Sequence, residues 1–454
     1  MGSPVAGSTV SKRSAAAAGT DSPSTSRSYV SRSRVAVIVQ GTVPPYYRIV
    51  LDMSRLLSPL PERGQRRPLT QRLTRRLTQG RTMEITGVNQ YHLRYGMDDS
   101  FRPAWKPGHE QTEHEVLLFE LETDAGISGV ATASGFAGRI DYLELAELFL
   151  VGEDPRDIDR VRDKLDTLNL WGPRPWHFEV ACWDIVGKDA GKPVYELLGG
   201  SGDPVPAYAS TGERRGVDER LAYVEERVDE GFEAVKLRCH GDDPGPDLEV
   251  TRRIREAYPD LTLMMDANMG WSVPMVEVEP WSFGDALGVA RELEAIGGIG
   301  WLEEPLDRRN YDGLARLREK TDVPIAGGEF NDGVHHFREF VKHGSLDVLQ
   351  PDAVLATGVK GALTVAGMAD THGLEFAPHT WNDGLGFVAN LHVLAATGAR
   401  WCEYPIEPPG WTPETRDFLL EAPVTAENGA VAPPDGPGLG VELDWDLIHD
   451  LDES

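Results

Sequence analysis

Three patterns of hydrophobic and polar residues follow one another along this chain of 454 residues. Residues 1–82 have no sustained helical or strand periodicity, and their best apolar run, at 35–39, is too short to form a core. The segment is rich in Ser, Ala and Arg and holds 14 Lys and Arg residues against 3 Asp and Glu. We predict that it is disordered, with Met83 as a candidate for the true start of the protein. A transit peptide is the alternative, because such peptides are also rich in Arg and Ser and poor in acids.

Between residues 83 and 204, strands are followed by helices. Two apolar stretches of strand character flank a Thr-Asp-Ala-Gly turn, at 115–122 and 127–132, and predict a hairpin. Apolar residues then recur at helical spacing in three stretches, at 140–149, 157–168 and 176–187. This order predicts an α+β capping domain over residues 83–204.

From residue 205 to residue 405, short apolar strands alternate with amphipathic helices. The eight predicted strands are 204–210, 233–239, 261–268, 299–305, 323–329, 346–352, 374–380 and 399–405. Because seven helices separate them, the pattern predicts an α/β protein with a parallel sheet, closed as a (β/α)7β-type TIM barrel. We expect residues 406–454 to return to the capping domain and complete it.

Seven consecutive predicted strands, from the second to the eighth, end in ionisable residues. In chain order these are Lys236 and Arg238, Asp266, Glu303 and Glu304, Glu329, Asp352, His379 and Glu403. A single acid at a strand end is usually a helix cap or a solvated charge. Barrel strands, however, converge on one mouth, where the active sites of such barrels lie, so we predict that these residues form one site.

The residue types at the strand ends indicate a chemistry. Asp266, Glu303 and Glu329 end adjacent strands, and three neighbouring carboxylates repel one another unless a cation neutralises them. An all-oxygen set favours Mg²⁺, so we predict one Mg²⁺ per site. The carboxylate of Asp352 is expected to fix the tautomer of His379 and leave its other nitrogen as a base. Lys236 lies across the mouth as a second acid–base candidate.

Composition excludes several classes of protein. The three cysteines have no CxxC spacing, which argues against a disulfide scaffold or a cysteine zinc site. The net charge of −28 argues against nucleic acid as the main partner, although binding through the basic tail is an open alternative. No apolar run is long enough to span a membrane, and we expect a cytoplasmic protein. Only eight Lys follow residue 82, a bias that resembles proteins of salt-loving organisms as well as ordinary acidic enzymes.

The motifs at the strand ends resemble those of the enolase superfamily, and within it the mandelate racemase subgroup, over about residues 83–445. They are Asp266-Ala267-Asn268, Trp301-Leu302-Glu303-Glu304-Pro305, Gly327-Gly328-Glu329, Gln350-Pro351-Asp352 and Pro378-His379-Thr380. The resemblance implies abstraction of the proton α to a carboxylate, with Mg²⁺ on Asp266, Glu303 and Glu329. It also implies that Glu304 points away from the metal and that Glu403 and Asn268 contact substrate oxygens.

One position departs from the family pattern, which often has Lys-x-Lys on the second strand. Here the second position is Arg238, which stays protonated and is a poor base. We therefore predict a one-base reaction with His379, the dehydration of a sugar acid to a 2-keto-3-deoxy acid, with Arg238 as a clamp. A racemase, epimerase or cycloisomerase of the same family is the nearest alternative, and a non-catalytic binding protein is another.

Specificity in this family lies in loops of the capping domain. The candidate loop is 94–112, and Trp105 and His109 are its expected substrate-binding residues. The predicted partner is a small carboxylate substrate, and the resemblance also implies a homo-oligomer.

Overall fold

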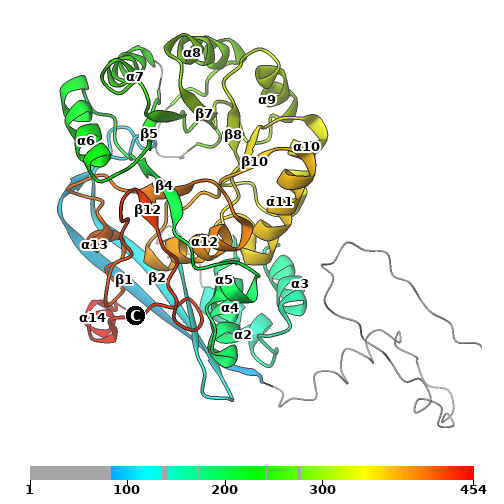
Figure 1. Cartoon of the computed structure of the whole chain (residues 1–454). Helices are drawn as coiled ribbons and strands as arrows, with labels where there is room; N and C mark the ends of the chain where they lie inside the picture. The colour runs from blue at the N-terminus through cyan, green and yellow to red at the C-terminus, as the bar shows by residue number, and fades with distance from the viewer. Residues whose placement is uncertain (1–82, 135–141, 171–173, 242, 273–277, 454) are drawn as a thin grey trace, which may run out of the picture. The chain divides into compact units, whose positions relative to one another are not determined.

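The computed structural model describes residues 83–453 apart from 135–141, 171–173, 242 and 273–277 (Figure 1). The segment 1–82, for which we predicted disorder, lies outside the described residues. Across the ranges described, no helix combines the length and apolar character needed to cross a membrane.

The capping domain is an antiparallel three-stranded sheet covered by helices. Its strands run in the order β1 (Ile85–Phe101), β2 (Gln111–Thr123) and β3 (Gly129–Ser134). Its helices are α2 (Tyr142–Leu150), α3 (Ile158–Leu168), α4 (His177–Ala190) and α5 (Val194–Leu197). Helix α4 lies so close to β3 that a Cβ atom on Gly129 would stand 2.1 Å from the carbonyl oxygen of Ala181. Glycine is therefore required at this crossing.

Strand β1 is longer than the hydrophobic pattern indicated. It pairs with β2 from Ile85 to Phe101, so the prediction of a loop over 94–112 is wrong for residues 94–101, and also for 111–112, which begin β2. The reason is that about half of the described residues of β1 are only partly buried, so the strand lacks the clear period-2 alternation by which a strand is recognised. The loop between β1 and β2 spans residues 102–110.

The barrel has eight parallel strands, as predicted. They are β4 (Val205–Ser210), β5 (Ala234–Arg238), β6 (Thr262–Asp266), β7 (Ile299–Glu303), β8 (Ile325–Gly327), β9 (Val348–Leu349), β10 (Glu375–Phe376) and β11 (Cys402–Pro405). Their order in the sheet is β10-β9-β8-β7-β6-β5-β4-β11. The two strands at the ends of this order, β10 and β11, form no hydrogen-bonded ladder with each other among the described residues. However, the Thr380 hydroxyl, which follows β10, donates to the carbonyl oxygen of Glu403 in β11 at 2.5 Å.

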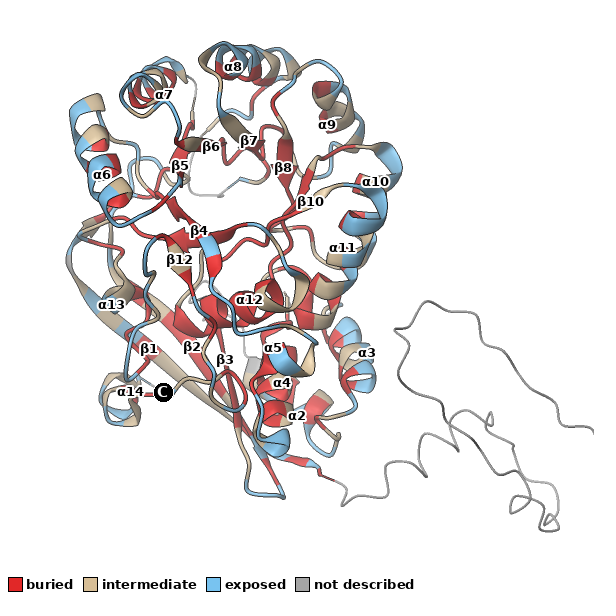
Figure 2. Ribbon diagram, in the orientation of Figure 1, coloured by how far each residue is buried: buried red, intermediate tan, exposed pale blue. Residues whose placement is uncertain are grey.

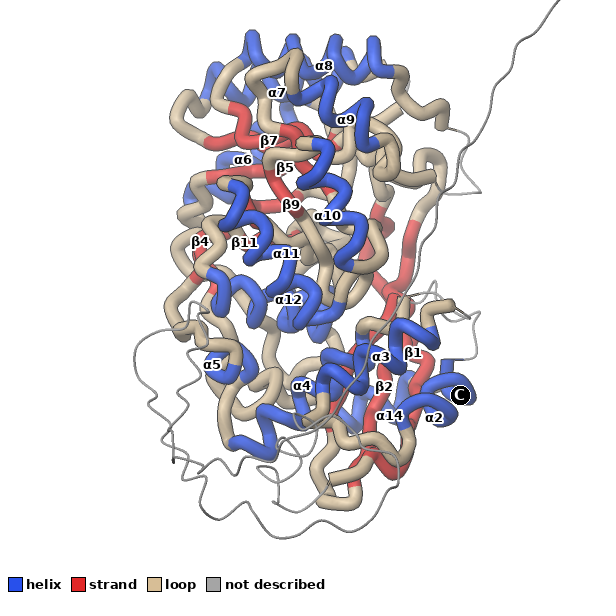
Figure 3. Tube along the Cα trace, turned by 90° about the vertical axis from the view of Figure 1, so that its right-hand side faces the viewer, coloured by secondary structure: helices blue, strands red, loops and turns tan. Residues whose placement is uncertain are grey.

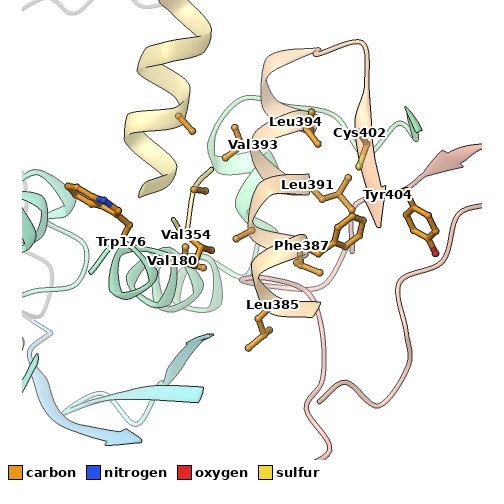
Figure 4. Packing of buried hydrophobic residues seen from close by; sticks show 14 of the residues in the cluster. Trp176, Val180, Val354, Leu385, Phe387, Leu391, Val393, Leu394, Cys402 and Tyr404 are labelled. Atoms are coloured by element: carbon orange, nitrogen blue, oxygen red, sulfur yellow. The ribbon is translucent and has the colours of Figure 1, made fainter. Parts of the chain in front are cut away.

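Seven helices alternate with these strands and surround them (Figure 3). They are α6 (Val217–Asp229), α7 (Gly245–Ala257), α8 (Phe283–Ile296), α9 (Tyr311–Arg318), α10 (Val334–His343), α11 (Gly358–His372) and α12 (Gly384–Thr397). Most helices expose one face, whereas the strands are buried on both (Figure 2). Helix α12 is the exception: its residues are buried almost throughout and pack on Cys402 and Tyr404 of β11 (Figure 4).

A layer of side chains fills the barrel beneath the carboxyl ends of the strands. Successive strands or their flanks contribute one buried residue each: Tyr208, Ala234, Met264, Trp301, Ala326, Val348, Ala377 and Trp401. Large and small residues share the layer, and the rings of Tyr208 and Trp301 meet edge to face at 5.4 Å. This packed floor supports the polar residues above it.

The C-terminal segment contacts both parts of the protein. Strand β12 (Ala430–Val431) pairs antiparallel with β4 and adds a strand beside the barrel that the hydrophobic pattern does not predict. The segment also contains α13 (Pro413–Arg416) and α14 (Trp445–Leu451). Helix α14 packs on β1, and the His92 backbone N–H beside it donates to the Asp452 carboxylate at 3.0 Å.

Candidate active site

Three carboxylates gather at the carboxyl ends of β6, β7 and β8. The parallel register places Asp266 opposite Glu303, and Glu329 follows two residues after β8. Oxygen atoms of all three lie within 4.8 Å of one another, and the three side chains are buried. The structure therefore brings together the three residues predicted to bind metal.

Burial and the charges of neighbouring acids make two of these carboxylates, Asp266 and Glu329, harder to ionise without a cation. Burial, followed by the charge of Glu303, raises the pKa of Asp266 to about 7. The pKa of Glu329 is also raised, chiefly by burial. Three buried oxygen donors with this electrostatic strain fit a hard divalent ion such as Mg²⁺.

Lys236 is a buried cation between two acids of the site. Its Nζ lies 2.8 Å from Glu303 Oε1 and 2.7 Å from Glu403 Oε1. Burial alone would lower the pKa of Lys236, but these acids and Asp266 raise it above its usual value. The same pairing outweighs burial in Glu403, whose pKa is lowered to about 2. The Ser210 hydroxyl also donates to Glu403 at 2.8 Å, a contact that the sequence analysis missed.

His379 and Asp352 form the predicted pair. His379 Nδ1 lies 2.8 Å from Asp352 Oδ2, and its Nε2 lies 3.4 Å from Glu329 Oε2 on the side of the carboxylates. A carboxylate oxygen accepts, so Nδ1 carries the proton and Nε2 is the atom available as a base. Burial would lower the pKa of His379, but Glu329, Glu403 and Asp352 together raise it to about 10.

Asp352 is held by more groups than its sequence neighbourhood suggested. Its Oδ1 accepts from the backbone N–H groups of Val354 and Leu355 at 2.7 and 3.0 Å. Asn382 donates to Oδ2 at 2.7 Å, and Asn390 donates to Oδ1 at 3.3 Å. Asn390 is a lone amide within the apolar helix α12, a signal that could have identified it.

Arg238 is fixed in place by groups on both sides of the site. Its Nη1 bonds the carboxylate of Asp266, and its Nε donates to the Thr211 carbonyl at 2.5 Å. The guanidinium stacks on Trp105 at 5.1 Å and on Trp381 at 4.9 Å. Trp105 belongs to the loop 102–110, so Arg238 links that loop to the predicted metal ligands. Trp381 was not predicted, although it follows the Pro-His-Thr motif directly.

The two other residues predicted to contact the substrate, Asn268 and His109, differ in where they lie. Asn268, in a left-handed backbone conformation with φ of 49°, donates to Asp266 Oδ2 at 3.0 Å and lies at the site. His109 is exposed on its loop, and no hydrogen bond or ring contact joins its side chain to a site residue within the described ranges. The structure therefore does not place His109 in the site.

Glu304 is buried beside the carboxylates but faces another direction. Its φ of 46° turns the chain at the end of β7, and its carboxyl group lies over Gly270. Burial first, then Glu329 and Asp266, raise its pKa well above the usual value.

Three further residues support the carboxylates and were missed. Trp301 Nε1 and Gln350 Nε2 each donate to Glu303 Oε2 at 2.9 Å. Trp271 Nε1 donates to Glu329 Oε1 at 2.9 Å. Trp301 and Gln350 stand inside the motifs named above, so their positions were visible although their roles were not.

Known proteins resemble this chain in sequence and in fold. Residues 219–447 match the family described as Enolase C-terminal domain-like. The D-galactarolactone cycloisomerase of Agrobacterium fabrum is 33% identical over 389 residues, which cover 81% of this chain and 99% of that protein. The arabinonate dehydratase of Saccharolobus solfataricus is 29% identical over 379 residues, covering 79% and 96%.

A solved structure agrees with these matches. The L-talarate dehydratase of a Polaromonas species, complexed with Mg and L-glucarate, has a TM-score of 0.70 and 26% identity. The similarity covers 82% of this chain and 98% of that one.

Proposed function

Because this chain belongs to the enolase superfamily, we propose that it is a Mg²⁺-dependent hydro-lyase acting on a sugar acid. It removes the proton α to the carboxylate and yields a 2-keto-3-deoxy acid. The observation that supports the proposal is the orientation of His379, whose Nδ1 lies on Asp352 and whose Nε2 faces the carboxylate cluster. We propose that His379 is the only base and that Arg238, where the family often has a second lysine, is not one.

Asp266, Glu303 and Glu329 would hold the Mg²⁺, since they form the buried oxygen cluster of the site. When bound, the ion supplies positive charge that stabilises the negative charge developing on the substrate carboxylate. With Glu329 neutralised, the pKa of His379 is expected to fall from about 10, which favours the neutral ring that a base requires.

His379 takes the α-proton on Nε2, and the C–H electron pair moves toward the carboxylate. Lys236 and Glu403, which form an ion pair at 2.7 Å, flank the place where the substrate carboxylate binds and orient that carboxylate. The C–O bond at the β-carbon then breaks, and His379 returns its proton to the departing hydroxyl, which leaves as water. Tautomerisation of the resulting enol gives the 2-keto acid, so one group serves as base and then as acid.

Arg238 supports elimination over racemisation. A racemase needs a working base on each face of the α-carbon. The guanidinium stays protonated at neutral pH, and its bonds to Asp266 and the Thr211 carbonyl leave it a fixed cation. Lys236 is held between two carboxylates, which favours its protonated form.

The names of relatives favour the same chemistry and also supply alternatives to it. An arabinonate dehydratase and a D-galactonate dehydratase are 29% and 30% identical to this chain. The 33% identical relative is a cycloisomerase, so lactone cycloisomerisation is the second candidate.

The test is a screen of the purified protein with Mg²⁺ against a library of sugar acids and sugar lactones in deuterated water. A dehydratase forms a keto acid that reacts with semicarbazide. A racemase only exchanges deuterium at the α-carbon, and a cycloisomerase consumes a lactone. Exchange without keto acid for every acid of the library would contradict dehydration.

A further inference from the structure

A pocket adjoins the carboxylate cluster on the side of β5, β6 and β7. Its lining includes Trp105, Trp271, His240, Asn268, Ser272 and Asp307. Two of these residues bond directly to predicted metal ligands: Trp271 donates to Glu329 at 2.9 Å, and the Asn268 backbone N–H donates to Asp266 at 2.8 Å. A substrate whose carboxylate lies at the cluster can therefore extend its far end into this pocket.

The two tryptophans of the pocket are held rigidly. The Trp271 ring meets Phe330 edge to face at 4.9 Å, in addition to its bond to Glu329. The Trp105 ring meets Trp381 edge to face at 5.4 Å. Rigid indole faces suit the C–H groups of a polyhydroxylated chain, because they bury apolar surface at little cost in conformational entropy.

The polar groups of the pocket include one acid. Asp307 contributes a carboxylate. Burial would raise the pKa of Asp307, but hydrogen bonds from Arg309 lower it overall, so this group is ionised at neutral pH. Hydroxyl groups can donate to such an acceptor, whereas a second carboxylate cannot.

The pocket offers no cation to a second carboxylate. Among its described lining residues there is no Lys or Arg. Arg238, which stacks on Trp105, is already bonded to Asp266 and the Thr211 carbonyl. Arg309 lies outside the lining and is already paired with Asp307 at 3.3 Å. A ligand carboxylate placed here would face Asp307 without a partner, which costs binding energy.

We infer that this pocket binds the uncharged, hydroxyl-bearing end of a monocarboxylic sugar acid and selects against the dicarboxylic acid of the same configuration. The inference rests on the proposed function for the placement of the first carboxylate. It goes further by naming the substrate class and Asp307 as a specificity-determining residue.

The test uses pairs of acids that differ only at the far end, where one has a CH₂OH group and the other a carboxylate. Suitable pairs are D-galactonate with galactarate, D-gluconate with D-glucarate, and D-xylonate with xylarate. Dissociation constants are measured by calorimetry on the Mg²⁺-loaded full-length protein, and keto-acid formation is followed separately. We expect the monocarboxylic member of the bound pair to bind about tenfold more tightly, the order expected for one unit charge at a partly exposed site.

Two variants test whether Asp307 causes the preference for monocarboxylic acids. Asp307→Asn keeps the shape of the side chain and should bring the two dissociation constants of a pair within about threefold. Asp312→Asn is the matched control, because Asp312 is 91% exposed on the neighbouring helix α9 and lies outside the pocket lining. It should leave the preference unchanged.

The inference is overturned if the wild-type protein binds the dicarboxylic member equally or more tightly, if Asp307→Asn leaves the preference intact, or if no acid of any pair binds. The first of these results does not depend on the folding of a variant. Preferential binding of monocarboxylic acids without keto-acid formation would instead refute the proposed dehydration and leave this inference standing.

Discussion

Replacement of Asp352 by Asn is the most direct probe of the proposed base. The backbone N–H groups of Val354 and Leu355 donate to Oδ1 at 2.7 and 3.0 Å, so an asparagine must place its carbonyl oxygen there. Its amide NH₂ then replaces Oδ2 and faces His379 Nδ1, which now lies 2.8 Å from that oxygen. Because an amide NH₂ donates and cannot accept, Nδ1 must become the acceptor and Nε2 must carry the proton.

The size of the effect follows from this change of tautomer. Nε2, on the side of the carboxylate cluster, would lose the lone pair that takes the α-proton. Loss of a positioned general base costs about 10²–10⁴-fold in rate, equivalent to about 2.7–5.5 kcal/mol of transition-state stabilisation. Asn382→Ala is the matched control, because it removes a 2.7 Å donor to the same Oδ2 and leaves the His379 bond in place. We expect it to lower the rate by less than about tenfold.

The assay is exchange of the α-proton in deuterated water, measured beside keto-acid formation with the substrate found in the screen. Nitrogen NMR of the histidine ring reports the tautomer directly. Asp352→Asn with wild-type exchange and with Nε2 protonated would refute the assignment of His379 as base. Equal losses in Asp352→Asn and Asn382→Ala would mean that the carboxylate acts only by holding the loop.

The remaining predictions concern the metal and Arg238. Asp266→Ala, Glu303→Ala and Glu329→Ala should each abolish activity and weaken Mg²⁺ binding measured by calorimetry, with the circular dichroism spectrum retained; full activity of Glu303→Ala would contradict the ligand assignment. Because the pKa of Asp266 is raised to about 7, Mg²⁺ affinity should rise with pH up to about 7 and then level, with proton release detected in buffers of different ionisation enthalpy. The raised pKa of this acid also means that stability of the metal-free protein falls as pH rises from about 4 to 7, visible as a lower Tm; a flat Tm over this range would contradict the shift. Arg238→Lys should raise KM by about tenfold or more, since Lys cannot keep the bonds to Asp266 and the Thr211 carbonyl together with the stack on Trp105; an unchanged KM would exclude the clamp.

The barrel was predictable because apolar residues recur with a different period in its strands than in its helices. Buried parallel strands such as β6 and β7 read as short apolar runs, and the helices between them are amphipathic. The capping sheet was harder to predict from the sequence, since β1 is partly exposed on both faces and lacks a clear alternation of apolar and polar residues. Strand β12 consists of two residues that pair with β4, and a pairing this short leaves no local pattern.

The site was predictable where a residue's role follows from its place at a strand end. Parallel strands bring their carboxyl ends together, so Asp266, Glu303 and Glu329 had to meet. Contacts between elements distant in sequence were not predictable in the same way. The bond from Asn390 on α12 to Asp352 and the stack of Arg238 on Trp105 depend on how a helix or loop is oriented. His109 is exposed on its loop, and membership of a loop near the mouth does not decide which side chain faces inward.

The arrangement of charges explains why an arginine at position 238 suits a one-base enzyme. Four acids, Asp266, Glu303, Glu329 and Glu403, are buried around the place where we propose that a substrate carboxylate binds. Lys236 lies closest to Glu303 and Glu403, at 2.8 and 2.7 Å, and 3.8 Å from Asp266, whose carboxylate also bonds Arg238. A lysine at position 238 could lose its proton and act as a second base, whereas an arginine keeps its charge beside Asp266 at any pH of interest. In the proposed reaction, an arginine at this position therefore gives up proton transfer on one face of the substrate and retains a permanent positive charge there, while His379 moves the proton on the other face.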